Sequence, residues 1–285
     1  MRSPRYLLLA LAAASAAAAC RDDEIVTATR PPLAGVRYVN ALGDTGRVDI
    51  KMVDQLAYSA NTNEGVGGIA FRAGTRYYST EAKARHIRVF AFQDSSATTV
   101  SSVILDDTVT FEPNRNYTLL LTGSARARTA QFRVIDDTDA PTPAAGQIAV
   151  RVYNAGAGAV DAYFTDTTTA AIAAATGSIR NTGDFAASAY AGRDTARLAV
   201  RVTAAGGTTV LASTQAAPGT VGTAAVNPVA GSRVAGTVFS AYVFPRAVAG
   251  SGALAGASAA QTTALSNTAV VLFVDKLPPN TVATP

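Results

Sequence analysis

The 285-residue sequence contains no tryptophan, one cysteine and one histidine. One cysteine cannot form an intrachain disulfide, and the Cys…Trp…Cys pattern of antibody-type domains is absent. A Ser-His-Asp or Cys-His triad, or a histidine-based metal site, would have to use His86. In the segment ARHIRVF, His86 alternates with Arg88 on the polar side of an expected strand. We therefore interpret His86 as a solvent-facing strand residue and predict no catalytic residue.

Several common binding motifs are also missing. The glycines stand in turn contexts and not in Walker or dinucleotide-binding motifs, so no cofactor is predicted. The basic residues are dispersed singly and are not interleaved with aromatics, which argues against nucleic acid as a partner. Loss of the leader described below would lower the formal charge from +4 to 24 − 2 − 20 = +2. The acids fall at expected strand ends and in a linker, which leaves a paired-carboxylate glycan hydrolase as the least favoured function.

Long apolar runs are scarce, and the first one opens the chain. Arg2 and Arg5 precede an apolar stretch from Tyr6 to Ala14, and the small residues Ser15 to Ala19 follow it. These are the three parts of an export signal. The apolar stretch is shorter than the roughly 20 residues that a permanent membrane helix needs. We therefore predict that residues 1–19 are a signal peptide.

The single cysteine stands directly after these small residues. The segment AAAC, Ala17–Cys20, resembles a bacterial lipobox, although Ala17 stands where leucine is usual. The resemblance implies that Cys20 receives diacylglycerol, and two or more acyl chains give durable membrane anchoring. The alternative is a plain secretory peptide, cut near Ala19, that leaves a free thiol. We expect an extracytoplasmic, lipid-anchored protein, and Arg21 in place of aspartate favours the outer membrane in a bacterium with two membranes.

The rest of the chain has the composition of a β protein. It is rich in Ala, Val, Thr and Gly, whereas the helix formers Glu, Lys, Leu and Met are scarce. Val48, Ile50 and Met52 alternate with Asp49 and Lys51, as in a strand with one apolar and one polar face. Sheets of such strands have one wet side and bury their dry faces against each other.

A duplicated segment predicts two modules. Residues 36–49, VRYVNALGDTGRVD, match residues 150–161, VRVYNAGAGAVD, so that Asn40 pairs with Asn154 and Asp49 with Asp161. Three further pairs occur in the same order: 87–91 with 198–202, 111–121 with 226–239, and 132–137 with 271–276. A matching order of landmarks indicates a duplication. The repeated Asn and Asp residues suggest either a duplicated ligand site or a structural role in a hairpin, and we favour the structural role.

We therefore predict an all-β fold of two tandem immunoglobulin-like β-sandwich modules. The expected parts are a tether at 20–34, module 1 at 35–138, a linker at 139–146, module 2 at 147–277 with a mobile loop near 247–267, and a tail at 278–285. The linker region contains Asp136, Asp137 and Asp139. Three carboxylates between two β modules suggest a calcium site, but we favour a solvated linker and predict no metal.

The same segments resemble a known family. The hairpin VRYVNA…GRVDI with its echo VRVYNA…AVDAY, the element FEPNRNYTLLLTG and the closing FVDKLPP are similar to DUF4397-domain proteins. The resemblance covers roughly residues 35–277. It implies a bacterial extracytoplasmic β protein, often a lipoprotein with repeated modules, and it supplies no catalytic residues.

These observations favour a non-catalytic, lipid-anchored envelope or surface protein that binds a protein or glycan, or that acts as a spacer. The alternative is an envelope-assembly lipoprotein that docks a partner by strand addition. Sandwich modules usually bind through end loops, so the loops at 42–47, 93–99, 156–159 and 204–208 are the predicted contact regions.

Overall fold

The computed structural model describes residues 31–54, 65–92, 103–248 and 265–282. Residues 33–285 form one compact unit. The signal peptide, Cys20 and most of the tether lie outside the described residues, as do loop 93–99 and most of loop 247–267. Within the described residues, no helix has the length and apolar character needed to cross a membrane.

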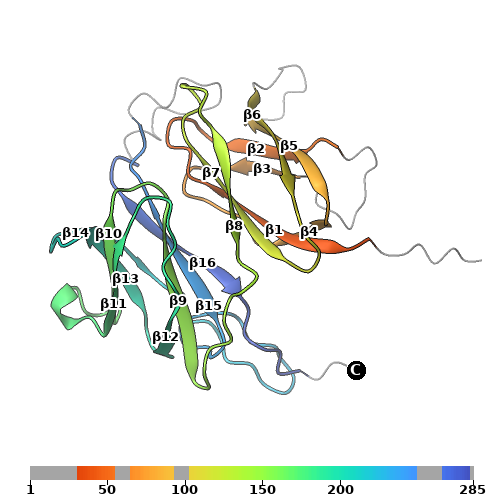
Figure 1. Cartoon of the computed structure of the whole chain (residues 1–285). Coiled ribbons are helices and arrows are strands. Elements are labelled where there is room, and N and C mark those ends of the chain that lie inside the picture. The colour runs from red at the N-terminus through yellow and green to blue at the C-terminus, as the bar shows by residue number, and fades with distance from the viewer. Residues whose placement is uncertain (1–30, 55–64, 93–102, 249–264, 283–285) are drawn as a thin grey trace, which may run out of the picture. The chain divides into compact units, whose positions relative to one another are not determined.

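The first eight strands form two four-stranded sheets (Figure 1). One sheet has the order β4-β1-β7-β8, from Tyr78–Glu81, Leu33–Asn40, Asn116–Thr122 and Gln131–Asp136. The other has the order β3-β2-β5-β6, from Gly65–Ile69, Val48–Met52, Ala84–Ala91 and Val103–Thr110. β1 and β7 pair in parallel, and every other pair of neighbours is antiparallel.

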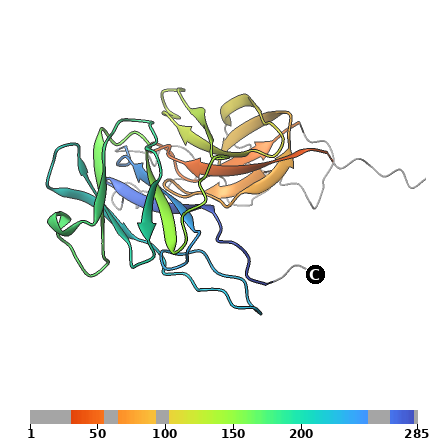
Figure 2. The ribbon, with the colours of Figure 1, turned by 60° about the horizontal axis from the view of Figure 1, so that its bottom comes forward.

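The last eight strands, drawn in green to blue in Figure 2, repeat this arrangement. One sheet has the order β12-β9-β15-β16, from Ala191–Asp194, Gln147–Asn154, Val238–Phe244 and Ala269–Lys276. The other has the order β11-β10-β13-β14, from Gly177–Thr182, Val160–Thr165, Ala199–Ala204 and Val210–Gln215. A short 3-10 turn, Ile172–Ala174, follows β10. Each strand takes the sheet position of the strand eight places earlier, and β9 and β15 are again parallel. The predicted all-β fold of two tandem sandwiches is confirmed.

Each sandwich has its own apolar core, made by the dry faces of its two sheets. In the first, the central members are Val36, Tyr38, Val48, Ile50, Ile87, Val89, Leu119 and Leu121. In the second, they are Val150, Val152, Val160, Ala162, Phe164, Val200, Val202, Ala241 and Val243. Full burial of one such side chain contributes about 1.5–3 kcal/mol. The alternation of apolar residues therefore positions both cores.

The prediction of one wet face per sheet is wrong for two of the sheets. The outward residues of β4-β1-β7-β8 and β12-β9-β15-β16 contact each other in a third apolar cluster. Its buried members are Val39, Ala41, Leu120, Tyr153, Ala155, Tyr242 and Phe244. Alternation shows which residues share a face of a strand, but it does not show whether another sheet covers that face. Here the duplicated sheets cover each other.

One glycine marks how closely the two sandwiches approach. A Cβ atom on Gly74 would lie 2.7 Å from the ring of Phe273 in β16 and 3.0 Å from the carbonyl oxygen of Tyr38. Phe273 in turn meets the ring of Tyr242 edge-on, with centroids 5.3 Å apart. Because real Cβ contacts are longer, the aromatic ring fits only against a residue without a side chain.

The strand register also corrects one predicted repeat pair. Ile87 lies opposite Met52, and Val200 lies opposite Phe164. Counting from the matched pair Val48 and Val160 along β2 and β10, the counterpart of Ile87 is therefore Val200 and not Leu198. Matching by apolar letters cannot detect such a two-residue shift, because the side-chain period of a strand is itself two.

Candidate functional site

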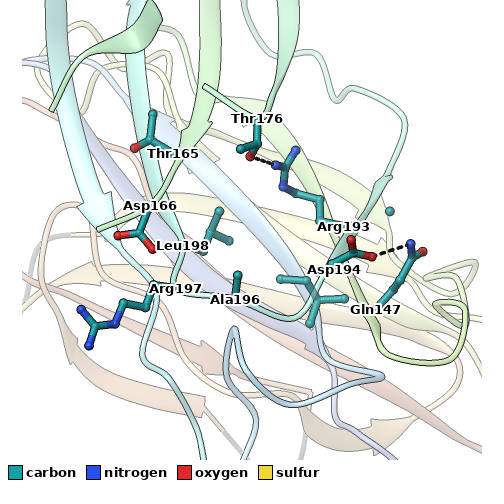
Figure 3. Close-up of a pocket in the computed structure, with 11 residues that line it drawn as sticks. Gln147, Thr165, Asp166, Thr176, Arg193, Asp194, Ala196, Arg197 and Leu198 are labelled. Carbon is teal, nitrogen blue, oxygen red and sulfur yellow. Dashed lines mark hydrogen bonds between the residues drawn. The ribbon is translucent and has the colours of Figure 1, made fainter. Parts of the chain in front are cut away.

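The second sandwich has a pocket at the end where β10 finishes and β13 begins. Its volume is about 480 Å³. Figure 3 shows the residues that line it. Its polar lining comes from Gln147, Thr165, Asp166, Thr176, Arg193, Asp194 and Arg197. A second hollow of about 650 Å³ shares Asp166, Ala196 and Arg197 with it and adds Thr168, Thr195 and Arg233. Charged and hydroxyl side chains therefore converge at one end of the second sandwich.

Asp166 is held in place by the turn that ends β10. The backbone N–H and the hydroxyl of Thr168 both donate to Asp166 Oδ1, at 2.8 and 2.7 Å. This is the bonding of an Asx turn. The two bonds from Thr168, together with the positive charges of Arg197 and Arg233, lower the pKa of Asp166. Its carboxylate is therefore ionised at neutral pH and faces basic neighbours.

Arg193 lies on the other side of the pocket, on β12. Its guanidinium donates to Thr176 Oγ1 and lies over the ring of Phe164, 4.8 Å from the centroid. Burial lowers the pKa of Arg193, and the charge of Asp194 opposes this shift. Next to it, Gln147 Nε2 donates to Asp194 Oδ1 at 3.1 Å. This side of the pocket is thus preorganised by its own hydrogen bonds.

Arg197 and Arg233 differ from Arg193 in having free guanidiniums. Both residues are exposed, and neither side chain has a hydrogen bond, ion pair or ring contact with any residue that the structure describes. Their charges act on Asp166, so both guanidiniums are near that carboxylate without pairing with it. Arginine offers five N–H donors in a planar fork that suits oxyanions. The pocket therefore presents unused donors to an incoming ligand.

A glycan hydrolase would need different electrostatics in this pocket. Its general acid is a carboxyl group whose pKa is raised toward neutrality, so that it can deliver a proton. The pKa of Asp166 is shifted in the opposite direction by Thr168 and the arginines. Asp166 is therefore not suited to the role of that general acid.

A second group of charges lies buried between the two sandwiches. Arg37 Nη2 donates to Asp137 Oδ2 at 3.3 Å and, across the contact, to Asp275 Oδ1 at 2.9 Å. Arg151 Nη2 donates across the contact to Asp137 Oδ1, and its Nε lies 3.8 Å from Asp275 Oδ2. All four side chains are almost fully buried, at 7% exposure or less. Each arginine thus bridges its own sandwich to the other.

The supporting contacts of this charge cluster are duplicated too. Arg37 Nε donates to Thr118 Oγ1 at 2.9 Å, and Arg151 Nε donates to Ser240 Oγ at 2.6 Å. The hydroxyl of Thr118 donates to Asp137 and that of Ser240 to Asp275. Asp137 is therefore the counterpart of Asp275, whereas the predicted match of 132–137 with 271–276 paired Asp136 with it. The register of β8 differs from that expectation by one residue.

Two tyrosines complete the duplicated cluster. Tyr77 donates to Asp137 Oδ2 at 2.7 Å, and Tyr190 donates to Asp275 Oδ2 at 2.9 Å. Arg37 and Arg151 lie over these rings, each 4.7 Å from the centroid. Burial is the main cause that raises the pKa of both tyrosines.

Perturbed pKa values often mark functional sites. Here, however, two positive and two negative charges cancel within a solvent-excluded contact. Neither pocket at the end of the second sandwich includes any of these residues. We therefore interpret the charge cluster as structural.

Comparison with known proteins places the first sandwich in a family. Residues 34–163 match the Domain of unknown function DUF4397. The match covers somewhat less than half of the chain and runs from β1 to Tyr163 in β10, so it includes the first sandwich and the opening hairpin of the second. The predicted family is confirmed for that span, and the likeness of the second module rests on its matching strand order.

The other comparisons are weaker. None of the curated proteins matches the sequence. A carbohydrate-binding module of family CBM26 from Eubacterium rectale, solved with maltoheptaose, is 12% identical, with a TM-score of 0.23 over 88% of this chain and 100% of that chain. A candidate cell adhesion protein from Bacteroides fragilis is 10% identical, with a TM-score of 0.20 over 87% of this chain and 100% of that chain. With TM-scores this low, neither likeness bears on what this chain binds.

The repeated asparagines stabilise hairpins in both sandwiches. Asn40 is fully buried, donates to the carbonyl oxygen of Ile69 at 3.0 Å and accepts from the N–H of Leu42 at 2.9 Å. Asn154 donates to the carbonyl oxygen of Thr182 at 3.0 Å and accepts from two N–H groups of its own turn. The side-chain amide of Asn40 therefore links β1 to the end of β3, and that of Asn154 links β9 to the end of β11.

The repeated aspartates bind backbone at a β-bulge. The register shifts after Val48 in the first sandwich and after Val160 in the second. Asp49 Oδ1 accepts from the N–H of Gly68 at 2.7 Å, and Asp161 Oδ1 accepts from that of Asn181 at 2.7 Å. Gly68 and Asn181 both have positive φ, as a bulge commonly requires. All six residues of β10, Asp161 included, are buried, so the expected wet side of a sheet is not found on this strand either.

The three linker aspartates do not share a site. Asp136 is exposed and pairs with Arg115, and Asp139 is exposed. Asp137 is 2% exposed and belongs to the buried cluster, so the prediction that this part of the chain is solvated is wrong for it. Its oxygens accept from Arg37, Arg151, Tyr77 and Thr118, which leaves little capacity for a calcium ion. Within the described ranges, no group of three or more acidic, histidine or cysteine side chains is arranged to hold a metal.

His86 lies on β5 with a side chain that is 40% exposed, and both His86 and Arg88 contact Asp106 on β6.

The prediction that loop 42–47 is a contact region is wrong, because residues 42–46 are buried. The N–H of Val248 donates to the carbonyl oxygen of Gly43, and the hydroxyl of Ser124 donates to Asp44. Loops 156–159 and 204–208 are largely exposed but lie at the opposite end of the second sandwich from the pocket.

Sequence reasoning missed the pocket residues. Their only signal is the segment GRDTAR, 192–197, which places three charges in five residues of a module with few charges. Such a segment before a strand is also typical of an ordinary solvated turn. What distinguishes it is the distant Asp166 and Arg233, which only the fold brings to it.

Proposed function

We propose that this chain is a non-catalytic, lipid-anchored envelope protein that binds a ligand in the pocket at the end of its second sandwich. The observation that carries the proposal is the pair of guanidiniums, Arg197 and Arg233, that line the hollow adjoining this pocket and have no partner in the described structure. An unpaired arginine contributes little to stability on a protein surface. It can, however, form strong charge-assisted hydrogen bonds with a ligand.

The anchor is part of the same proposal. The segment Ala17–Cys20 and the apolar leader support lipidation at Cys20, with the outer membrane favoured by Arg21. Metabolic labelling with a palmitate analogue should tag the wild-type protein and not the variant Cys20→Ala. Equal labelling of both, or labelling of neither, would contradict the anchor.

Ligand binding is tested independently of the anchor. The purified chain is screened against envelope glycan fragments by a thermal-shift assay, because a ligand that binds the native state raises the transition temperature. Arg197→Ala and Arg233→Ala should abolish the shift, whereas His86→Ala should leave it intact. Hydrolysis of a fragment that is lost when one carboxylate is removed would instead show an enzyme.

Strand addition remains a second candidate, and one observation favours it. β14 is an edge strand of its sheet, and its Val210 and Leu211 are 39% and 42% exposed. Apolar side chains on an open edge can accept an added strand. Leu211→Lys should then abolish cross-linking to an envelope partner, while Arg197→Ala should not affect it.

A further inference from the structure

The pocket differs from a surface that merely carries charge. Three guanidiniums, of Arg193, Arg197 and Arg233, border two adjoining hollows, and only the first of them is committed to a protein partner. A ligand group that meets the two free guanidiniums must accept several N–H donors at once. Carboxylate, sulfate and phosphate groups do this, and neutral groups do it poorly.

The acidic and amide groups in the pocket restrict the ligand further. Asp166 keeps Oδ2 without a hydrogen bond in the described structure, and Gln147 and Asp194 line the opposite side. Ionised carboxylates accept hydrogen bonds from hydroxyl groups, which the acidic side chains of a peptide do not have. The pocket therefore combines donors for an oxyanion with acceptors for hydroxyls.

The apolar part of the lining adds a third restriction. The pocket is lined by no aromatic side chain among the described residues, and the one ring beside it, Phe164, is covered by Arg193. A flat, uncharged sugar ring would find no exposed aromatic face on which to stack. Binding must then depend on the polar groups.

We propose that Arg197 and Arg233 clamp the oxyanion of an acidic saccharide, while Asp166 accepts hydrogen bonds from its hydroxyl groups. This inference rests on the proposed function, because it names the ligand class of the same pocket. The favoured group is the carboxylate of a hexuronic acid, which is planar and matches the fork of a guanidinium in a bidentate contact. A sulfated saccharide shares this chemistry and is a separate arm of the test.

The experiment is calorimetric titration of the full chain with three probes: trigalacturonate, its fully methyl-esterified form, and a sulfated disaccharide. Trigalacturonate should bind, and its methyl ester should bind at least about 10-fold more weakly, because esterification removes the charge and leaves the hydroxyls. Affinity should also fall as salt rises from low to physiological concentration. Tighter binding of the sulfated probe would identify sulfate as the oxyanion and would overturn the preference for carboxylate.

Matched variants locate the binding. Arg197→Ala and Arg233→Ala should each weaken trigalacturonate binding by about 10-fold or more. Arg128→Ala removes the same charge from an exposed residue of the first sandwich and should not change the affinity. Arg197→Lys keeps the charge without the planar fork and should bind at an intermediate strength. Arg128, Arg197 and Arg233 are all exposed, so each variant should have the thermal transition of the wild type. This measurement serves as the folding check.

Three results would overturn the inference, and only the second of them would also reject the proposed function. Equal binding of the acid and its methyl ester, lost in Arg197→Ala, would keep the pocket as the binding site and reject oxyanion recognition. Acid binding that Arg197→Ala and Arg233→Ala leave unchanged would place the ligand elsewhere and reject both. Absence of binding by all three probes would reject the acidic saccharide as ligand.

Discussion

Arg37 in β1 donates to Asp275 beside the end of the chain's last strand at 2.9 Å, although 238 residues separate them in the sequence. The reciprocal bond runs from Arg151 to Asp137. Because the two sandwiches have the same strand order, equivalent residues meet in the manner of a twofold interface inside one chain. The duplicated halves are therefore joined by their own repeated residues and not only by the linker.

The first prediction concerns this charge cluster. Asp275→Ala should lower the free energy of unfolding by about 3–5 kcal/mol, because it leaves two buried guanidiniums without full compensation. Urea denaturation measures the change. Asp139→Ala, which removes an exposed carboxylate, should change it by less than about 0.5 kcal/mol. A loss from Asp275→Ala as small as that of the control would show that the cluster is not closed in solution.

The second prediction concerns the linker. Residues 142–146 are largely exposed, so a protease site inserted between Pro143 and Ala144 should be cut readily in the native protein. The two halves should nevertheless elute together in size-exclusion chromatography, because the apolar cluster and the charge cluster both hold them. Separate elution of the cut halves would show that the linker alone joins them.

The third prediction tests the close approach at Gly74. Gly74→Val should destabilise the protein by about 1–3 kcal/mol, since its side chain would overlap the ring of Phe273. Gly183→Val is the control, because a Cβ at Gly183 meets no atom within 4 Å and the backbone there is not in the left-handed region. The double variant Gly74→Val with Phe273→Ala should recover part of the overlap cost, as double-mutant analysis would show.

Local chemistry explains what the sequence predicted correctly. Asn40 and Asn154 bond within their own hairpins and the next strand, and their repetition indicated a structural role. The apolar alternation of β2 likewise places Val48 and Ile50 in the core. Both features depend on neighbours that are close in the sequence, so pattern and turn chemistry were sufficient.

The charge cluster could not be predicted in the same way. Asp137 appears in the sequence as one of three linker acids, and nothing local distinguishes it from its exposed neighbour Asp136. Its burial depends on partners 60 and 100 residues away, Tyr77 and Arg37. The pocket could not be predicted from the sequence for the same reason, because only the fold brings Asp166 and Arg233 together.

The last prediction is a pH dependence carried by Asp161. Burial raises the pKa of this carboxyl, but the N–H groups of Asn181 and Gly206 and the charge of Arg180 outweigh it, so the net pKa is lowered. A lowered folded-state pKa stabilises the protein above the pKa of an unfolded aspartate, about 3.9. That contribution is lost as the pH falls from there through the folded-state value.

Asp161→Asn retains an oxygen acceptor but cannot be ionised. The stability difference between the wild type and Asp161→Asn should therefore be constant near neutral pH and shrink below about pH 3.9. Asp139→Asn, which alters an exposed side chain with no partner among the described residues, should follow the wild-type curve. A difference for Asp161→Asn that persists unchanged to low pH would show that the carboxylate charge contributes nothing and that only the hydrogen-bond geometry at the bulge matters.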